Sequence, residues 1–112
     1  MPRQAATVDR TAYLREFYLK RKDVYKEKHL QKAYGISLND FIKMLEDQGY
    51  RCGICATHLA EANPKNVHID HCHDSGVIRG VLCNSCNMGI GMLKDNVTVL
   101  KQAIVYLEKH SA

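Results

Sequence analysis

The chain has 112 residues, of which 46% are apolar and 25% are charged. This length is that of one domain, and the composition is that of a soluble globular protein rather than a disordered one. No apolar run approaches the roughly 18–20 residues that a membrane span requires, and the N-terminal residues MPRQAATVDR lack the apolar stretch of a secretory signal. We therefore expect a cytoplasmic protein that does not contact membranes.

Positive charge is concentrated in the N-terminal third of the chain. Residues 1–35 contain nine Lys or Arg and four Asp or Glu, whereas the other residues contain seven basic and eight acidic side chains. The absence of Pro and Gly predicts one long helix from about Asp9 to Tyr34. Its basic face either follows a nucleic-acid backbone or is exposed to solvent while its apolar stripe packs on the core. The candidate nucleic-acid contacts in it are Lys20, Arg21, Lys22 and Lys26.

A second helix is expected shortly after Gly35, which should end the first. Ser37 followed three residues later by Asp40 has the spacing of a capping box, in which each side chain accepts a hydrogen bond from the other residue's backbone N–H. Gly49 is placed to end this helix, whose apolar residues are Phe41, Met44 and Leu45.

A further helix is expected towards the C-terminus. Asp95 or Asn96 can cap it, and the apolar residues that follow recur at helical spacing and define one face. This face consists of Val97, Leu100, Ala103, Ile104 and Leu107. We expect the helix to pack on the centre of the chain; the alternative is a contact between two copies of the chain.

The cysteines predict a structural metal site. Five cysteines are an odd number, which fits a disulfide framework poorly, and four of them form two C-x-x-C pairs. Two such pairs supply the four thiolates of a closed tetrahedral Zn²⁺ site. A redox role is less favoured because no βαβ pattern surrounds either pair. The predicted zinc ligands are Cys52, Cys55, Cys83 and Cys86.

The segment between the two cysteine pairs predicts a β-hairpin. Residues 67–73 (VHIDHCH) and 77–82 (VIRGVL) contain the β-branched residues of two strands, and the polar turn 74–76 (DSG) separates them. The second cysteine pair then opens a helix that carries Asn84 and Asn87. The local order is strand, turn, strand and helix. We therefore predict a small α+β fold in which zinc staples the hairpin to the helix.

Asp70 and His71, at the end of the first strand, are candidate catalytic residues. A carboxylate is a hard ligand suited to Mg²⁺ or Mn²⁺, and a histidine can accept a proton from water near neutral pH. Asn87 could offer a second oxygen to the same ion. Metal-assisted hydrolysis of a phosphodiester fits this set, and a plain surface turn is the alternative. Three histidines within residues 68–73, between two zinc-binding pairs, favour the catalytic interpretation.

Residues 52–87 resemble the recombination endonuclease VII branch of the HNH nucleases, also called ββα-metal or His-Me finger nucleases, of phages and bacteria. The matching motifs occur in the order and at the spacing of that family. They are Cys52-x-x-Cys55, Ile69-Asp-His-Cys-His73, Arg79-Gly-Val-Leu-Cys83, Cys83-x-x-Cys86-Asn87 and, on either side, Tyr34-Gly-Ile-Ser37, Gly89-x-Gly91 and Lys94-Asp-Asn96. The resemblance implies a zinc-bound nuclease core over residues 36–112, preceded by the basic helix of residues 1–35.

The resemblance also implies roles for individual residues. His71 would be the general base, and His73 would contact the scissile phosphate or the leaving group. Asp70 and Asn87 would bind the catalytic Mg²⁺ or Mn²⁺. The hairpin loop lacks the Asn that orients the base in many HNH enzymes, as does the endonuclease VII branch.

The family cuts DNA and leaves a 5′-phosphate, and its best-known phage member also cuts branched junctions and mismatches. We therefore expect DNA as the partner, in the cytoplasm of a bacterial or phage-infected cell. Only residues 87–112 follow Cys86, too few for the long region through which that phage member dimerises. Junction resolution is therefore not expected, and the chain is either a monomer or a homodimer.

Two further residues of the hairpin have open roles. Arg79 lies in the middle of the second strand and could reach a DNA phosphate or pair with an acid; we favour the phosphate. Cys72, between two candidate catalytic residues, is expected to pack rather than to bind a metal. A different class of function is a catalytically silent zinc module that binds nucleic acid or a protein partner. Such a module would need the cysteines but not Asp70, His71 or Asn87.

Overall fold

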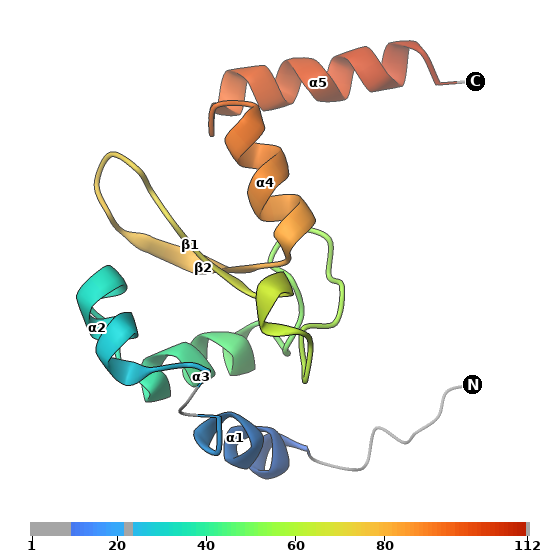
Figure 1. Ribbon diagram of the computed structural model, residues 1–112. Coiled ribbons are helices and arrows are strands. Elements are labelled where there is room, and N and C mark those ends of the chain that lie inside the picture. Colours follow the sequence, from blue (N-terminus) through green and yellow to red (C-terminus); the bar gives the residue numbers. More distant parts are fainter. Residues whose placement is uncertain (1–9, 22–23, 112) are drawn as a thin grey trace, which may run out of the picture.

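The computed structural model describes residues 10–21 and 24–111 and has an α+β fold, as predicted (Figure 1). A two-stranded antiparallel sheet lies between an N-terminal group of helices and a C-terminal pair of helices. Among the described helices, none combines the length and the apolar character that a membrane span needs. The elements in chain order are α1 (Thr11–Leu19), α2 (Glu27–Tyr34), α3 (Leu38–Asp47), the short 3₁₀ helix η2 (Pro64–Asn66), β1 (His68–His71), β2 (Ile78–Leu82), α4 (Asn84–Met92) and α5 (Val97–Lys109).

The predicted single helix from Asp9 to Tyr34 is wrong, because α1 ends at Leu19 and α2 begins at Glu27. The break lets Tyr18 and Tyr25 both pack on Phe41, at ring centroid distances of 6.2 and 5.2 Å. The two tyrosine rings also lie only 5.5 Å from each other, whereas seven residues of unbroken helix would separate their backbones by about 10 Å along the axis. Burial of aromatic surface therefore outweighs local helix propensity here. The expected helix start at Asp9 lies outside the described residues.

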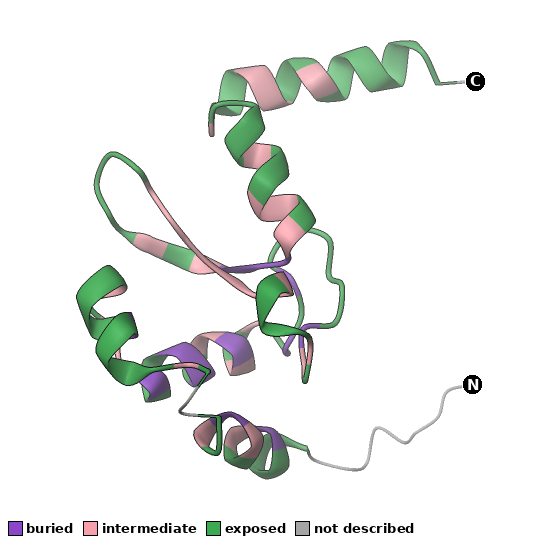
Figure 2. Ribbon diagram, viewed as in Figure 1, coloured by how far each residue is buried: buried purple, intermediate pink, exposed green. Residues whose placement is uncertain are grey.

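The hydrophobic core joins α1, α3 and the base of the hairpin. Figure 2 shows the buried residues gathered on α3, on the facing side of α1 and where β2 runs into the second cysteine pair. The Tyr18 hydroxyl donates a hydrogen bond to the Leu59 carbonyl at 3.1 Å and accepts one from the Glu61 N–H at 3.2 Å. The largest fully buried side chains of the core are Tyr18, Phe41, Ile42, Leu45, Leu59 and Val81.

Helix α3 begins and ends as the sequence predicts. The Asp40 N–H donates to the Ser37 hydroxyl at 3.0 Å, and the Ser37 N–H donates to the Asp40 carboxylate at 3.0 Å, which is the expected capping box. Gly49 follows the helix with a left-handed φ of 65°. This turn delivers the chain directly into the first cysteine pair.

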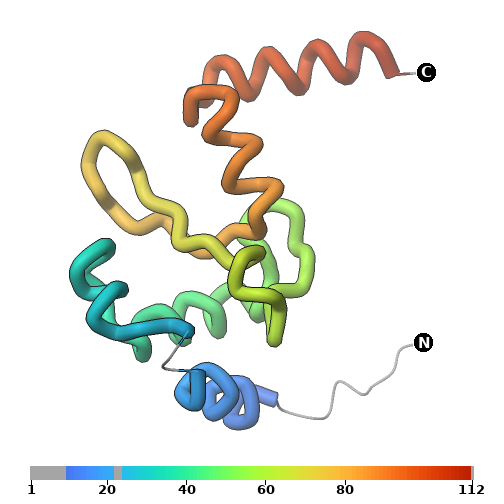
Figure 3. The backbone as a smooth tube through the Cα atoms, viewed as in Figure 1, coloured from blue at the N-terminus to red at the C-terminus, as the bar shows by residue number. Residues whose placement is uncertain are grey.

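Helix α5 forms and is capped by Asn96, whose side chain accepts a hydrogen bond from the Val99 N–H at 3.0 Å. Its expected packing on the centre of the chain is wrong, because none of its residues is buried. Lys94 and Asp95 adopt left-handed φ values of 65° and 55°, and α5 leaves this turn in a direction that carries it away from the hairpin (Figures 1 and 3). The large apolar side chains that it exposes are Val97, Ile104, Val105, Tyr106 and Leu107.

Candidate metal centre and hydrolytic site

The four predicted zinc ligands lie together. The sulfur atoms of Cys52, Cys55, Cys83 and Cys86 are all within 4.8 Å of one another, and those of Cys55 and Cys83 are 3.7 Å apart. Tetrahedral Zn²⁺ with Zn–S bonds near 2.3 Å requires sulfur–sulfur distances of about 3.8 Å. The cluster therefore has the dimensions of a tetrathiolate metal site, and Cys72 is not part of it.

The electrostatics of the cluster favour a bound cation. Burial opposes ionisation of the Cys52 thiol, but backbone N–H groups directed at its sulfur lower its pKa to about 6. Burial and the neighbouring thiols raise the pKa of Cys86 to about 12. Four thiolates this close repel one another, and a divalent cation between them removes that repulsion. The donor set is soft, which suits zinc.

Both cysteine pairs contact the elements around the hairpin: the second pair lies at the junction of β2 and α4, and the first pair is hydrogen-bonded to β2. Cys83 follows β2 directly and caps α4, because its sulfur accepts a hydrogen bond from the Cys86 N–H at 3.5 Å. The Gly53 N–H, within the first pair, donates to the Val81 carbonyl of β2 at 3.1 Å. The predicted order of strand, turn, strand and helix is therefore confirmed.

Gln48, which the sequence analysis did not single out, connects α3 to the hairpin. Its side-chain amide donates to the Val81 carbonyl at 2.9 Å and accepts from the Val81 N–H at 2.8 Å, as a neighbouring strand would. A Cβ at Gly80 would lie only 2.7 Å from the Gln48 Oε1 atom. This close approach gives a physical reason for glycine in the Arg79-Gly-Val-Leu-Cys83 motif.

The two strands pair with a β-bulge beside the candidate catalytic residues. Asp70 is opposite Gly80, but His71 is opposite Ile78, so Arg79 is the extra residue. Bulges redirect side chains and are frequent next to active sites. Here the bulge lies between Asp70 and His71, where the sequence predicts catalysis.

The Asp70 carboxylate is bound by Arg79. The Nε and Nη2 atoms of Arg79 donate to its two oxygens at 2.7 and 2.9 Å, while Nη1 and Nη2 also donate to Asp95 at 3.1 and 3.0 Å. Hydrogen bonds from Arg79 lower the pKa of Asp95, and the two carboxylates raise the pKa of Arg79. Arg79 therefore pairs with two acids, which was the alternative considered from the sequence, and its contact with a DNA phosphate stays a prediction. Asp95 was not singled out as a site residue from the sequence.

The candidate bases His71 and His73 are brought together. Their ring centroids are 5.2 Å apart, and the Tyr34 ring, from the end of α2, lies 5.9 Å from His71. Tyr34 belongs to the motif that precedes the cysteines, but the sequence assigned it no role. Asp70 therefore contacts the α4–α5 side of the hairpin through Arg79, whereas His71 contacts α2.

In the described part of the chain, Asn87 makes no hydrogen bond to the other candidate catalytic residues, Asp70 and His71. It lies half-buried in the first turn of α4, and its backbone N–H donates to the Cys83 carbonyl at 3.0 Å. Within residues 10–21 and 24–111, no hydrogen bond connects its side chain to Asp70 or His71.

A solvent-open hollow lies between the hairpin turn and the α4–α5 turn. It is lined by His73 and Asp74 from one side and by Gly91, Lys94 and Asp95 from the other. His73 thus faces the same space as the acid that anchors Arg79.

The basic residues predicted to contact nucleic acid differ in whether they already have a partner within the protein. Lys20 pairs with Glu16 at 3.8 Å, and the Arg21 guanidinium covers the Phe17 ring at 4.1 Å. Lys26 is exposed at the start of α2 and has no ion pair within the described part of the chain. Lys22 lies outside the described residues.

The chain is similar to proteins of two mycobacterial phages. It is 37% identical over 99 residues to the gene 59 protein of Mycobacterium phage D29, which covers 88% of this chain and 59% of that protein. It is 36% identical over 94 residues to the gene 59 protein of Mycobacterium phage L5, which covers 83% of this chain and 56% of that protein. The chain therefore spans less than three-fifths of the length of these curated relatives.

No solved structure matches the chain. The family described as recombination endonuclease VII matches residues 27–109, a segment that includes the cysteine cluster, the hairpin and the helices on both sides of them. A family with this description indicates a nuclease. The chain belongs to the recombination endonuclease VII family.

Proposed function

We propose that the chain is a metal-dependent DNA endonuclease of the HNH type that hydrolyses phosphodiester bonds. Membership of the recombination endonuclease VII family supports a nuclease. The observation that carries the proposal is the 5.2 Å contact between the His71 and His73 rings, on a hairpin that is anchored to the cysteine cluster and also carries Asp70. An imidazole that can accept a proton and a carboxylate that can bind a cation are both used in metal-assisted hydrolysis of a phosphate.

His71 acts as the general base in this proposal. It takes a proton from a water molecule, the water oxygen attacks the phosphorus, and the bond to the 3′-oxygen breaks to leave a 5′-phosphate. His73 faces the solvent-open hollow beside Asp95 and contacts the scissile phosphate or the departing oxygen. The edge-to-face contact with Tyr34 limits the orientations that the His71 ring can adopt.

Asp70 and Asn87 would hold Mg²⁺ or Mn²⁺, which when bound supplies positive charge for the phosphate oxygens and the departing oxygen. The donor set fits such an ion, since Mg²⁺ commonly takes one or two carboxylates and fills its other positions with water and phosphate. Each Asp70 oxygen accepts one hydrogen bond from Arg79 and keeps a second lone pair.

We further propose DNA as the partner, bound by a monomer or homodimer in the cytoplasm of a bacterial or phage-infected cell. Residues 36–112 would form the nuclease unit. Lys26 and the neighbouring basic side chains of α2 are exposed and available to phosphates.

Supercoiled plasmid tests the proposal. The purified chain should nick it with Mg²⁺ or Mn²⁺ and not without a divalent ion, and H71A should abolish nicking while zinc content and circular dichroism stay unchanged. H110A is the matched control, because His110 is an exposed histidine at the C-cap of α5. Nicking by H71A at the wild-type rate would show that the base is a different residue.

A second candidate is a catalytically silent zinc module that binds nucleic acid. The ion pair between Asp70 and Arg79 favours it, since the positive charge of Arg79 beside the carboxylate opposes the approach of a divalent cation. Retardation of DNA without cleavage in Mg²⁺ or Mn²⁺ would support this candidate over the enzyme.

A further inference from the structure

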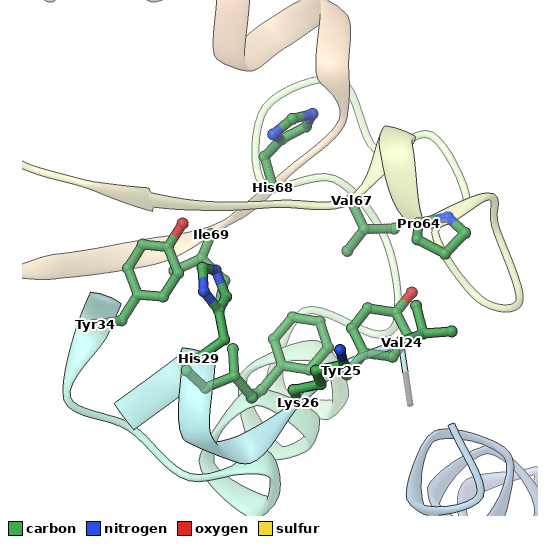
Figure 4. Close-up of a pocket in the computed structure, with 11 residues that line it drawn as sticks. Val24, Tyr25, Lys26, His29, Tyr34, Pro64, Val67, His68 and Ile69 are labelled. Carbon is green, nitrogen blue, oxygen red and sulfur yellow. The ribbon is translucent and has the colours of Figure 1, made fainter. Parts of the chain in front are cut away.

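A pocket of about 180 Å³ lies between α2 and the start of β1 (Figure 4). Figure 4 shows His29 and Tyr34 side by side at one end of it and Tyr25 at the other, below Val67. Pockets of roughly 300–1,000 Å³ enclose drug-sized molecules. This smaller, partly open pocket accepts one ring system and leaves the remainder of a ligand outside.

The pocket combines apolar walls with polar groups that have no protein partner. Phe41 and Ile69 contribute to the walls. Within the described part of the chain, the hydroxyls of Tyr25 and Tyr34 and the ring nitrogens of His29 form no hydrogen bond. Burial raises the pKa of Tyr25 to about 12, so its hydroxyl stays protonated and can donate. A flat heterocycle with hydrogen-bonding edges matches this lining.

Lys26 places a positive charge at the edge of the pocket. Lys28 and Lys32 are exposed elsewhere on α2 and add positive charge to the helix, although they do not line the pocket. In the part of the chain that is described, these three lysines have no ion-pair partner. A ligand with an aromatic ring and flanking negative charges is therefore favoured over a neutral small molecule, and a nucleotide within a strand has both features.

A series of ring contacts connects the pocket to the proposed base. His29 in the pocket is 6.2 Å from Tyr34, and Tyr34 is 5.9 Å from His71, measured between ring centroids. At a rise of 3.4 Å per nucleotide, these two steps together correspond to at most about four nucleotides. A DNA strand that passes His71 can therefore place a nearby base in the pocket.

We propose that the pocket between α2 and β1 binds one unstacked base of the DNA strand, within about four nucleotides of the phosphate that His71 attacks. This rests on the proposed nuclease function. A base inside a duplex is stacked on both faces and cannot enter the pocket unless it leaves the stack. The chain therefore binds DNA that contains an unpaired nucleotide more tightly than fully paired DNA.

Two matched ligands test the pocket. Both are DNA duplexes with a single unpaired nucleotide, which carries a thymine in one and no base in the other, so that charge and backbone are the same. Affinities are measured for the full zinc-loaded chain without Mg²⁺ or Mn²⁺. Wild type should bind the thymine-bearing duplex about 5- to 150-fold more tightly, the range expected for stacking of one base on aromatic side chains.

Two variants assign this preference to the pocket. V67F fills the pocket, and H29A removes an exposed wall residue without disturbing the core. In both variants the affinity for the thymine-bearing duplex should fall to that for the baseless duplex, and binding of the baseless duplex should be retained. The control H110A should keep the wild-type ratio of the two affinities. K26Q should weaken both ligands equally, in contrast to K101Q on α5.

A wild-type ratio of one, or a ratio that H29A and V67F leave unchanged, would overturn the proposal. Zinc content and circular dichroism identify a variant that fails to fold, and H29A provides the test if V67F does. Since no bond is broken in this experiment, its result is independent of the plasmid assay. A normal ratio with no nicking would disprove only the nuclease function, and nicking with a ratio of one would disprove only the base pocket.

Discussion

Arg79 and Asp70 face each other across the hairpin as a two-pronged ion pair, with hydrogen bonds of 2.7 and 2.9 Å to the two carboxylate oxygens. The same guanidinium is held by Asp95 in the turn after α4, through bonds of 3.1 and 3.0 Å. Two-pronged pairs fix orientation as well as charge. The carboxylate that we propose as a ligand of the catalytic ion is thus oriented by Arg79, and Arg79 is in turn held by Asp95 in the turn before α5.

Replacing Arg79 tests this orienting contact. R79K keeps the positive charge but loses the planar fork, so it cannot hold both carboxylates in the same way. We expect the nicking rate to fall about 10- to 100-fold, as is typical when a partner of a metal ligand is lost. R10K is the control, because Arg10 pairs with Glu61 instead of a hairpin residue. If R79K also weakens DNA binding measured without divalent ions, Arg79 contacts a phosphate as the sequence suggested.

The close approach of Gly80 to Gln48 predicts a large effect of one methyl group. In G80A the new Cβ would lie 2.7 Å from Gln48 Oε1, an atom held by a hydrogen bond to Val81. We expect a loss of about 1–3 kcal/mol in the free energy of unfolding, the usual cost of overpacking. Chemical denaturation measures it. G89A should instead stabilise the chain slightly, since this glycine lies in α4 with open space around it.

Zinc is expected to hold the hairpin in place. C83S should lose the metal and lower the melting temperature sharply, because so small a fold depends on its structural ion. Serine can still cap α4, so the loss would come from the metal and not from the helix start. Metal analysis and thermal melting followed by circular dichroism measure both effects. C72S should keep zinc and melt like wild type, since Cys72 is outside the cluster; equal melting of C83S and wild type would contradict a structural zinc.

Buried tyrosines predict instability at high pH. Burial and then the nearby Glu46 carboxylate raise the pKa of Tyr50 from 10.0 to about 12. Because this pKa is higher in the folded state, its contribution to stability is complete below pH 10 and is lost as the pH rises to about 12. We expect the melting temperature of Y50F to fall less than that of wild type between these values. Y106F should follow wild type, because Tyr106 is exposed on α5.

Features that depend on near neighbours in the sequence were predicted correctly. The capping box of Ser37 and Asp40, the two cysteine pairs and the Gly-containing turn of the hairpin each need only a few adjacent residues. Their residue types and spacing carry the information directly. The cysteine cluster could therefore be anticipated in full.

Features that depend on distant contacts were not predicted. The break before α2 follows from the joint packing of Tyr18 and Tyr25 on Phe41, which no local pattern signals. The partners of Arg79 depend on a bulge that changes the register of the hairpin and on a turn 16 residues further on. In the sequence, Gln48 is an ordinary residue at the end of a helix. Its hydrogen bonds to Val81 can be recognised only when β2 is known to lie beside it.

Because α5 contributes no buried side chain to the core, its sequence is decoupled from the folding of the remainder. Substitutions on its exposed apolar face can alter colloidal behaviour and adhesion to other molecules while the melting temperature stays constant. Conversely, a mutation that weakens the core does not alter the side chains of this exposed apolar face. Solubility and thermal stability are thus separately adjustable properties of this chain.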